Sequence, residues 1–307
     1  MGYKRAGFQV LGNVEIDPKI NKMYIRNHHP EYNFCMDLRR FNELEEIPEE
    51  LIGIDILDGS PPCTSFSTSG AREKGWVKKK KFREGQAYQT LDDLFFVFLD
   101  TVEKLQPKIV VAENVVGMIK GKAKGYVQLV IKRFRDLGYE VQIFQLNSAT
   151  MDVPQARNRL FFIANRMGYE KLILDFNNEQ INFGKVRSEK GKAFGENGKT
   201  LKVLLESAKE TDLDLREVGR RIAGEKNKYF SEKILHDRRI PPTITSAGSF
   251  FRYADRMMCS DEDFRNMQTF PQDYDFDGNN VQYVCGMSVP PNMMANIATE
   301  IYKQWLS

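Results

Sequence analysis

Long apolar runs are scarce in this chain of 307 residues. The longest stretch made only of apolar side chains is Leu94–Leu99, far short of the roughly 20 residues that a membrane-spanning helix needs. The first residues, Met1–Arg5, are followed by no apolar core of the signal-peptide type. We therefore expect no association with a membrane and a location in the cytoplasm.

Cysteine is also scarce. The four cysteines are widely separated and show none of the paired spacings of metal sites. We expect no metal site, and free thiols in a reducing compartment.

No strong excess of one charge is present, because the formal net charge is only +3. Overall charge is therefore weak evidence for a polyanionic partner. The basic residues are unevenly placed, however: seven of them lie between Arg72 and Arg83, against the single acid Glu73. Such runs are usually solvated loops, but this one begins a few residues after Cys63.

Short strand-like runs alternate with helix-like stretches through the first half of the chain. Apolar residues recur with helical spacing over 91–105 and 126–137, and Pro107 and Gly138 end these two stretches. The strand candidates are 8–15, 54–57, 109–112, 141–146 and 160–164, the last two as a hairpin pair. Because β-α-β alternation produces a doubly wound sheet, we expect an α/β fold with a ligand site at the carboxyl ends of its strands.

The character of the chain changes after residue 166. Asn, Lys, Glu and Gly dominate from about 167 to 239, and helical periodicity is poor there apart from 201–209. A helical pattern returns over 292–305. We expect a main domain over 1–166, a smaller domain over 167–280, and a C-terminal segment over 281–307 that returns to the first domain.

Four polar segments lie next to predicted strands or open the last helix, where a catalytic site on this architecture would need them. They are Pro62-Cys63, Glu113-Asn114-Val115, Gln155–Arg159 and Gly286–Val289. Taken singly, each has an ordinary structural explanation: a buried cysteine, a helix cap or ion-pair partner, a surface arginine pair. Their order along the chain makes them informative together.

In this order the segments resemble the DNA (cytosine-5)-methyltransferases. The signature of that family is Pro-Cys, Glu-Asn-Val, Gln-x-Arg-x-Arg and a late Gly-Asn-Ser-Val, and Arg265–Pro271 matches its Arg-x-x-Gln-x-Phe-Pro segment. The resemblance extends from about Gly2 to Ile301, although 167–239 matches only in position. It implies the S-adenosylmethionine-dependent methyltransferase fold, with 1–166 as the catalytic and cofactor-binding domain and 167–280 as the target-recognition domain.

The implied reaction is methyl transfer from S-adenosylmethionine to C5 of cytosine. C5 is a poor nucleophile until a group adds to C6, and a thiolate suits this role because it attacks well and leaves again by elimination. The resemblance assigns that role to Cys63. It places Glu113 as the acid at the N3 edge of the base, and Arg159, with Arg157 behind it, as the donor to O2. The base that removes the C5 proton is not identified; water is one candidate.

The implied partner is double-stranded DNA, from which the cytosine must be flipped out before this chemistry can occur. The family's segment after the cysteine is a loop that closes over DNA, so we expect Lys78, Lys79, Lys80 and Lys81 to meet phosphates. Gln155 is also expected to contact DNA. We expect a monomer in a bacterial or phage restriction–modification setting, with any cognate restriction endonuclease acting separately.

The resemblance also implies a binding site for S-adenosylmethionine. Glu15 matches the acid that binds the ribose hydroxyls, Ile16 the side chain against the adenine, and Asp37 the acid that accepts from the adenine amine. Further walls of the site match Pro62, Leu94, Ser288 and Val289.

The sequence departs from the family at its front. The family's first strand and glycine-rich turn, which hold the methionine end of the cofactor, have no counterpart, and Met1–Phe8 matches the tail of the first helix. Losing about five buried apolar residues would cost roughly 1.5–3 kcal/mol each, so we expect impaired cofactor binding and folding. Either Met1 is an internal methionine or a separate polypeptide supplies the front piece. Met287 also replaces the usual Asn of Gly-Asn-Ser-Val.

Two other functions compete with this interpretation. A catalytically silent DNA-binding remnant would explain the lost cofactor turn, but Cys63, Glu113 and Arg159 are all intact. A tRNA cytosine-5 methyltransferase is the second, and its Cys-Phe-Thr signature is absent.

Overall fold

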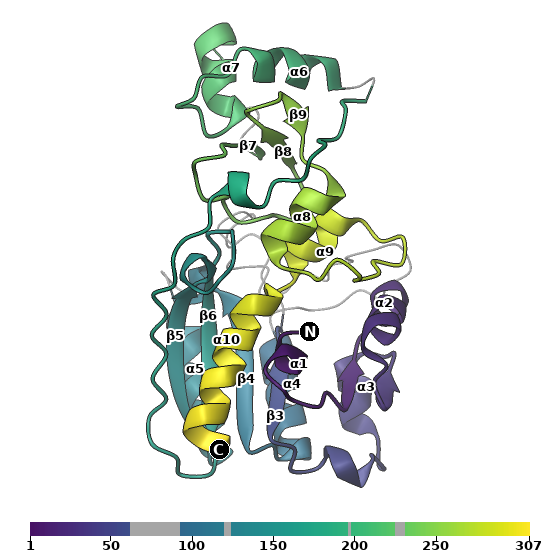
Figure 1. Ribbon diagram of the computed structural model, residues 1–307. Coiled ribbons are helices and arrows are strands. Elements are labelled where there is room, and N and C mark those ends of the chain that lie inside the picture. The colour runs from purple at the N-terminus through teal and green to yellow at the C-terminus, as the bar shows by residue number, and fades with distance from the viewer. Residues whose placement is uncertain (62–92, 120–123, 196–197, 225–230) are drawn as a thin grey trace. The chain divides into compact units, whose positions relative to one another are not determined.

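The computed structural model describes residues 1–61, 93–119, 124–195, 198–224 and 231–307 (Figure 1). These residues form two compact units. Unit 1 comprises Met1–Phe8, Asn147–Arg157 and Asp175–Thr299, and unit 2 comprises Gln9–Leu146, Asn158–Leu174 and Glu300–Ser307. The division by compactness therefore falls at other residues than the boundaries at 166 and 280, which remain a prediction about function.

The larger sheet of unit 2 has the strand order β3-β4-β6-β5. Its strands are β3 (Ile56–Gly59), β4 (Ile109–Val115), β5 (Glu140–Asn147) and β6 (Asn158–Asn165). β3 is parallel to β4, and β6 is antiparallel to β4. β4 and β6 read as nearly continuous apolar runs because residues on both of their faces are buried.

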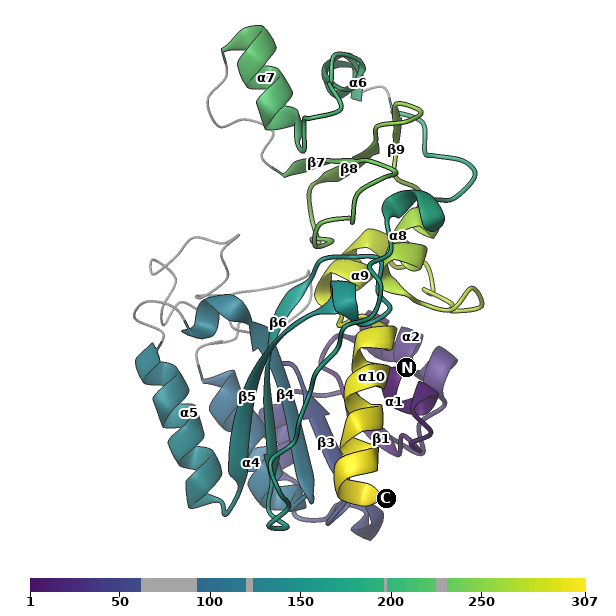
Figure 2. The ribbon, with the colours of Figure 1, turned by 60° about the vertical axis from the view of Figure 1, so that its left-hand side comes forward.

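One face of this sheet is covered by α4 (Leu94–Leu105) and α5 (Lys124–Asp136), which lie along it side by side in Figure 2. Phe98 and Val102 of α4 and Val130 and Phe134 of α5 share one apolar core with alternate residues of β4 and β6. Two predicted helices and four predicted strands are thereby confirmed, because hydrophobic periodicity reports a face that packs against a core.

A second sheet of unit 2 consists of β1 (Gly12–Val14) and β2 (Tyr32–Phe34), which are parallel. They are connected by α2 (Pro18–His28) and followed by α3 (Leu38–Glu43) and a 3-10 turn at Glu49–Leu51. Among the described residues no ladder joins this pair to the larger sheet. The single doubly wound sheet that we expected is therefore divided in two in the described part of the chain.

Apolar side chains nevertheless hold the two sheets in one unit. Phe41, Leu51 and Leu105 form a buried cluster that also contacts Val14 of β1 and Leu57 of β3. Residues of α3, the 3-10 turn and α4 thus pack against both sheets.

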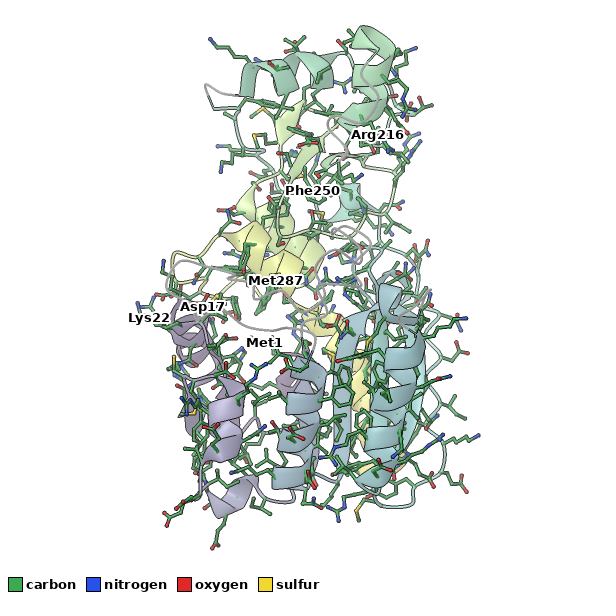
Figure 3. The ribbon with its side chains drawn as sticks, turned by 180° about the vertical axis from the view of Figure 1, so that it is seen from behind. Met1, Asp17, Lys22, Arg216, Phe250 and Met287 are labelled. Carbon is green, nitrogen blue, oxygen red and sulfur yellow. The ribbon has the colours of Figure 1, made fainter. Side chains whose placement is uncertain are left out.

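Unit 1 contains a three-stranded sheet with two helices. The elements are α6 (Lys199–Glu206), α7 (Leu215–Ala223), β7 (Glu232–Leu235), β8 (Ser249–Arg252) and β9 (Met257–Met258). Leu205, Val218, Ile234 and Phe251 form their shared core. Figure 3 labels Arg216 on α7 and Phe250 on β8, and the Phe250 ring packs edge-on against Phe264, with ring centroids 5.6 Å apart.

Three further helices follow in the sequence. They are α8 (Asp261–Gln268), α9 (Val281–Met287) and α10 (Pro291–Ile301), with a π-helical turn at Tyr302–Leu306. The short α1 (Gly2–Arg5) packs on α10 so closely that a Cβ at Gly2 would lie 2.4 Å from Cβ of Met294. Short 3-10 turns occur at Val116–Ile119, Ser148–Thr150 and Phe183–Lys185. None of the described helices has the length and apolar character that crossing a membrane requires.

Candidate active site

Glu113 and Arg159 meet on the larger sheet of unit 2. Glu113 stands opposite Phe161 in the β4–β6 ladder, and Arg159 stands opposite Val115. Glu113 and Arg159 are therefore diagonal neighbours on one face. Arg159 Nε lies 2.8 Å from Glu113 Oε1, and the two side chains are only 14% and 12% exposed. The structure thus brings together two of the side chains predicted to be catalytic.

Burial and the ion pair act in opposite directions on Arg159. Burial lowers the pKa of its guanidinium, and the Glu113 carboxylate raises it. Removing either partner would leave the other ionisable group partly buried without its counter-charge, which is costly. The Glu113 carboxylate therefore stabilises the charged form of Arg159 at this largely buried position.

Asn114 connects this pair to the segment that leads to Cys63. β3 and β4 run parallel, with Gly59 opposite Ala112, so their carboxyl ends lie at the same edge of the sheet. The buried Asn114 side chain donates from Nδ2 to the carbonyl of Pro61 at 3.1 Å. Cys63 and Pro62 lie outside the described residues, and Cys63 is two residues beyond Pro61 in the chain.

Arg157 is almost completely buried, at 2% exposure, in unit 1. Its Nη1 donates to the carbonyl of Ile244 at 3.2 Å, and its Nη2 donates to the carbonyl of Gly286 at 3.0 Å. These two bonds give Arg157 a structural role in the described residues. Its part in ordering the cytosine site remains a prediction.

Glu15 and Ile16 directly follow β1. The Glu15 amide donates to the carbonyl of Phe34 at 3.0 Å, which extends the β1–β2 pairing by one step. Its Oε1 accepts from the amide of Asp17 at 2.8 Å, and Asp17 in turn caps α2 by accepting from the Lys19 amide. Figure 3 labels Asp17 at the start of that helix. Local hydrogen bonds therefore fix the Glu15 carboxylate at the carboxyl edge of the sheet.

Asp37 and Leu94 are brought together at the starts of α3 and α4. Asp37 caps α3 by accepting from the amide of Arg39 at 2.8 Å. Nη2 of Arg39 lies 2.7 Å from Oδ1 of Asp93, the residue before Leu94. Arg39 thus links the predicted adenine acceptor to a predicted wall of the same site.

Ser288 and Val289 lie in unit 1 and are both half-buried. The Ser288 carbonyl accepts from Nε2 of Gln268 at 2.9 Å. The neighbouring Gly286 packs so tightly that a Cβ there would lie 2.3 Å from the backbone nitrogen of Ser246. The glycine of this motif is therefore required by packing, whereas Met287 is 54% exposed.

Five residues were predicted to contact DNA, and one of them, Gln155, lies in the described part of the chain. Lys78, Lys79, Lys80 and Lys81 lie outside the described residues. Gln155 is fully buried, and its side-chain amide is engaged by Ile244 and Gln268. A contact between Gln155 and DNA would require these bonds to open, so its assignment to DNA remains a prediction.

The described residues fit the nucleoside half of S-adenosylmethionine. Two carboxylates, Glu15 and Asp37, follow adjacent parallel strands at one sheet edge, and the half-buried apolar Ile16 stands between β1 and α2. Carboxylates accept from hydroxyl and amine donors, which are the groups that ribose and adenine present. No described segment supplies the glycine-rich turn expected for the methionine end.

Two contributors to this site were not predicted as site residues. Asn114 stands inside the Glu-Asn-Val segment, but its partner Pro61 is 53 residues away in the chain. No sequence pattern marked Arg39 as a site residue, because its partner Asp93 is 54 residues away and both residue types are common at surfaces.

Comparison with known proteins agrees with these features. Residues 1–303 match the family model described as C-5 cytosine-specific DNA methylase. Type II methyltransferase M1.HphI of Haemophilus parahaemolyticus is 27% identical over 99% of this chain and 83% of that protein. Type II methyltransferase M.NgoPII of Neisseria gonorrhoeae is 34% identical over 55% of this chain, which spans only 45% of that protein's length.

A solved methyltransferase structure has the same fold as this chain. A protein described as a DNA modification methyltransferase, encoded within an E. coli prophage, superposes with a TM-score of 0.72. It is 17% identical, and the match covers 100% of this chain and 95% of that one. The match of the family model over nearly the whole chain shows that this protein belongs to the C-5 cytosine-specific DNA methylase family.

Proposed function

We propose that this protein transfers a methyl group from S-adenosylmethionine to C5 of a cytosine flipped out of duplex DNA. The observation that carries the proposal is the Glu113–Arg159 pair, held beside the Asn114–Pro61 bond that leads to Cys63. Family membership supports DNA as the substrate, and the Type II names of the relatives support a role in restriction–modification.

Each side chain has a separate task in the proposed reaction. The Cys63 thiolate adds to C6, while Glu113 acts as the acid at the N3 edge of the ring and Arg159 donates to O2, so the negative charge on the ring is stabilised. S-adenosylmethionine, when bound, supplies an electrophilic methyl group for C5. The transfer would release S-adenosylhomocysteine. A base, for which water is one candidate, then takes the C5 proton, and elimination of the Cys63 thiolate restores the aromatic ring and the free enzyme.

The Glu113–Arg159 ion pair has a consequence for this scheme. Arg159 Nε faces Glu113 Oε1 in this pair, and N3 and O2 are neighbouring positions on one edge of cytosine. The pair can therefore hold the two side chains next to each other for contacts with these two atoms.

Cofactor binding is proposed for Glu15, Ile16, Asp37 and Leu94 of unit 2. For Ser288 and Val289 of unit 1 the same role is proposed from the family resemblance alone. Glu15→Gln should raise the Kd for S-adenosylhomocysteine about tenfold, because an amide is a weaker acceptor for two ribose hydroxyls than a carboxylate. Calorimetric titration measures this change. An unchanged Kd would remove Glu15 from the proposed site.

The activity itself is tested in cells. The chain and its Cys63→Ala variant are expressed in a host without cytosine-5 methylation, and the genomic DNA is sequenced after bisulfite treatment. One short motif should be protected with the intact chain and none with the variant. If the intact chain protects no cytosine although it binds DNA, the silent DNA-binding remnant becomes the better description.

A further inference from the structure

Two buried glutamines of unit 1 form a continuous chain of side-chain amides. The Ile244 amide donates to Oε1 of Gln155 at 2.9 Å. Nε2 of Gln155 donates to Oε1 of Gln268 at 2.7 Å, and Nε2 of Gln268 donates to the carbonyl of Ser288 at 2.9 Å. Both glutamines are 0% exposed. We call this sequence of three hydrogen bonds the amide relay.

The two ends of the relay fix its direction. The Ile244 end is a backbone N–H, which can only donate, and the Ser288 end is a backbone carbonyl, which can only accept. Gln155 must therefore present its oxygen to Ile244 and its nitrogen to Gln268, and Gln268 must have the same orientation. If either amide turned over, two buried donors or two buried acceptors would face each other, which is costly without water.

One end of the relay belongs to a strap formed by residues 241–246, the segment that leads into β8. Ala156 and this strap exchange two bonds: the Ala156 amide donates to the Pro241 carbonyl, and the Thr243 hydroxyl donates to the Ala156 carbonyl, both at 2.8 Å. Gln155 and Arg157 hold the amide and the carbonyl of Ile244 from either side of Ala156. The Gln-x-Arg spacing thus clamps both backbone groups of one residue.

The other end of the relay belongs to the loop that carries Ser288 and Val289. Gln268 is the last residue of α8, and it also reaches the hydroxyl of Ser288 at 3.2 Å. Gly286, two residues earlier, lets the strap pass within van der Waals distance of this loop. The relay and this close approach therefore connect the same two segments independently.

We infer that Gln155 and Gln268 are positioning residues that hold the strap and the loop of Ser288 and Val289 in a fixed relative position. The strap lies in the predicted target-recognition domain and the loop is a predicted wall of the cofactor site, so DNA binding and cofactor binding would be coupled. This inference rests on the proposed function for the meaning of the two sites. It assigns Gln155 to the interior of the protein, where its effect on DNA passes through Ile244.

The test uses methionine, which has nearly the volume of glutamine but neither donates nor accepts strongly. Gln155→Met and Gln268→Met should each raise the KM for DNA and the Kd for S-adenosylhomocysteine together, by about tenfold, since each leaves buried partners unpaired. The double variant should be no worse than either single one, because one break already interrupts the relay.

Gln142→Met is the matched control. Gln142 donates to the Leu172 carbonyl at 3.0 Å and accepts from the Leu172 amide at 2.8 Å, which is the same chemistry in unit 2. This variant should lower Tm without changing either constant. If Gln142→Met raises the KM for DNA and the Kd for S-adenosylhomocysteine as the relay variants do, general destabilisation explains the effects of the relay variants and the inference is overturned.

Two patterns would overturn the relay directly. If Gln155→Met raises the KM for DNA and Gln268→Met does not, Gln155 contacts DNA itself. If the effects of the two single variants multiply in the double variant, the glutamines act independently.

Hydrogen exchange separates this inference from the proposed function. The Ile244 amide should exchange about tenfold faster in Gln268→Met, although Gln155 stands between Gln268 and Ile244 in the relay. This holds whether or not the protein methylates DNA, so an inactive wild type would overturn only the proposed function. If the methionine variants fail to fold, Gln268→Glu, measured at a pH where its carboxyl is ionised, keeps the acceptor for Gln155 and loses the donor to Ser288. It should weaken cofactor binding and leave Ile244 protected, and the reverse would overturn the relay.

Discussion

Arg159 Nε lies 2.8 Å from Glu113 Oε1, across neighbouring antiparallel strands and largely out of water. This geometry places the acid and the cation that the proposed reaction needs on one face of the sheet. It also makes them depend on each other for stability, which allows the structural and chemical roles of the pair to be separated.

Glu113→Gln and Arg159→Met should each destabilise the protein, by about 2 kcal/mol or more, because each leaves a partly buried partner unpaired; fully buried pairs lose roughly 3–5 kcal/mol. The double variant should recover much of this loss in urea unfolding. Methyl transfer should fall by about 10²–10⁴ in all three variants. Recovery of activity together with stability in the double variant would show that the pair is only structural.

Asn114→Asp should slow the reaction of Cys63, because an aspartate cannot donate to the Pro61 carbonyl. The loss of this bond should cost about 1–2 kcal/mol of stability. Asn42→Asp is the control, since Asn42 donates to the Val97 carbonyl at 2.9 Å in the same unit. Rates of covalent adduct formation should fall for Asn114→Asp and stay near wild type for Asn42→Asp. Equal rates in the two variants would contradict the role of the Asn114–Pro61 bond.

Gly286→Ala should destabilise unit 1 by about 1–3 kcal/mol, the usual cost of overpacking, since its Cβ would lie 2.3 Å from the Ser246 nitrogen and 2.5 Å from the Thr245 carbonyl carbon. Gly125 in α5 is the control, because a Cβ there meets nothing within 4 Å. Gly125→Ala should be neutral or stabilising, as expected for alanine in a helix. Thermal unfolding measures both, and a neutral Gly286→Ala would contradict the close approach of the strap.

The chain's described thiols should differ sharply in reactivity. Burial raises the pKa of Cys285 to about 12 and that of Cys259 well above its ordinary value, so at pH 8 both are protonated thiols, the unreactive form. Cys35 is exposed. Iodoacetamide should therefore modify Cys35 in the native protein, and Cys259 and Cys285 only after denaturation, as read by peptide mass spectrometry. Rapid native labelling of Cys285 would contradict its burial.

The elements that could be predicted from sequence are those with a clear apolar signal. α4 and α5 were within a few residues of their predicted bounds because each has one apolar face on a shared core, and β4 because it is a short apolar run buried on both faces. α2 was not predicted, although Asp17 and Pro18 form a helix start of the usual kind. Its polar composition leaves no apolar stripe long enough to detect.

Site residues could be predicted where the residue type itself indicates the chemistry. They could not be predicted where a hydrogen-bond partner far away in the sequence determines the position of the side chain. Glu113 and Arg159 were expected to act on one base, and the structure places them in contact. Gln155 was expected to contact DNA, but it is buried against Gln268. The sequence could not indicate this pairing, because the two residues are 113 positions apart and no local pattern connects them. The division of the sheet likewise depends on pairing between strands, which their separate apolar runs do not specify.

In the proposed reaction, Cys63 forms a transient bond to an extruded cytosine. The direct measurement incubates the protein and S-adenosylmethionine with duplex DNA in which cytosine is replaced by 5-fluorocytosine, whose C5 fluorine blocks the elimination step. Denaturing electrophoresis and peptide mapping should find a methylated base attached to Cys63, and none with Cys63→Ser. Bound DNA without an adduct, or an adduct at another residue, would contradict the account.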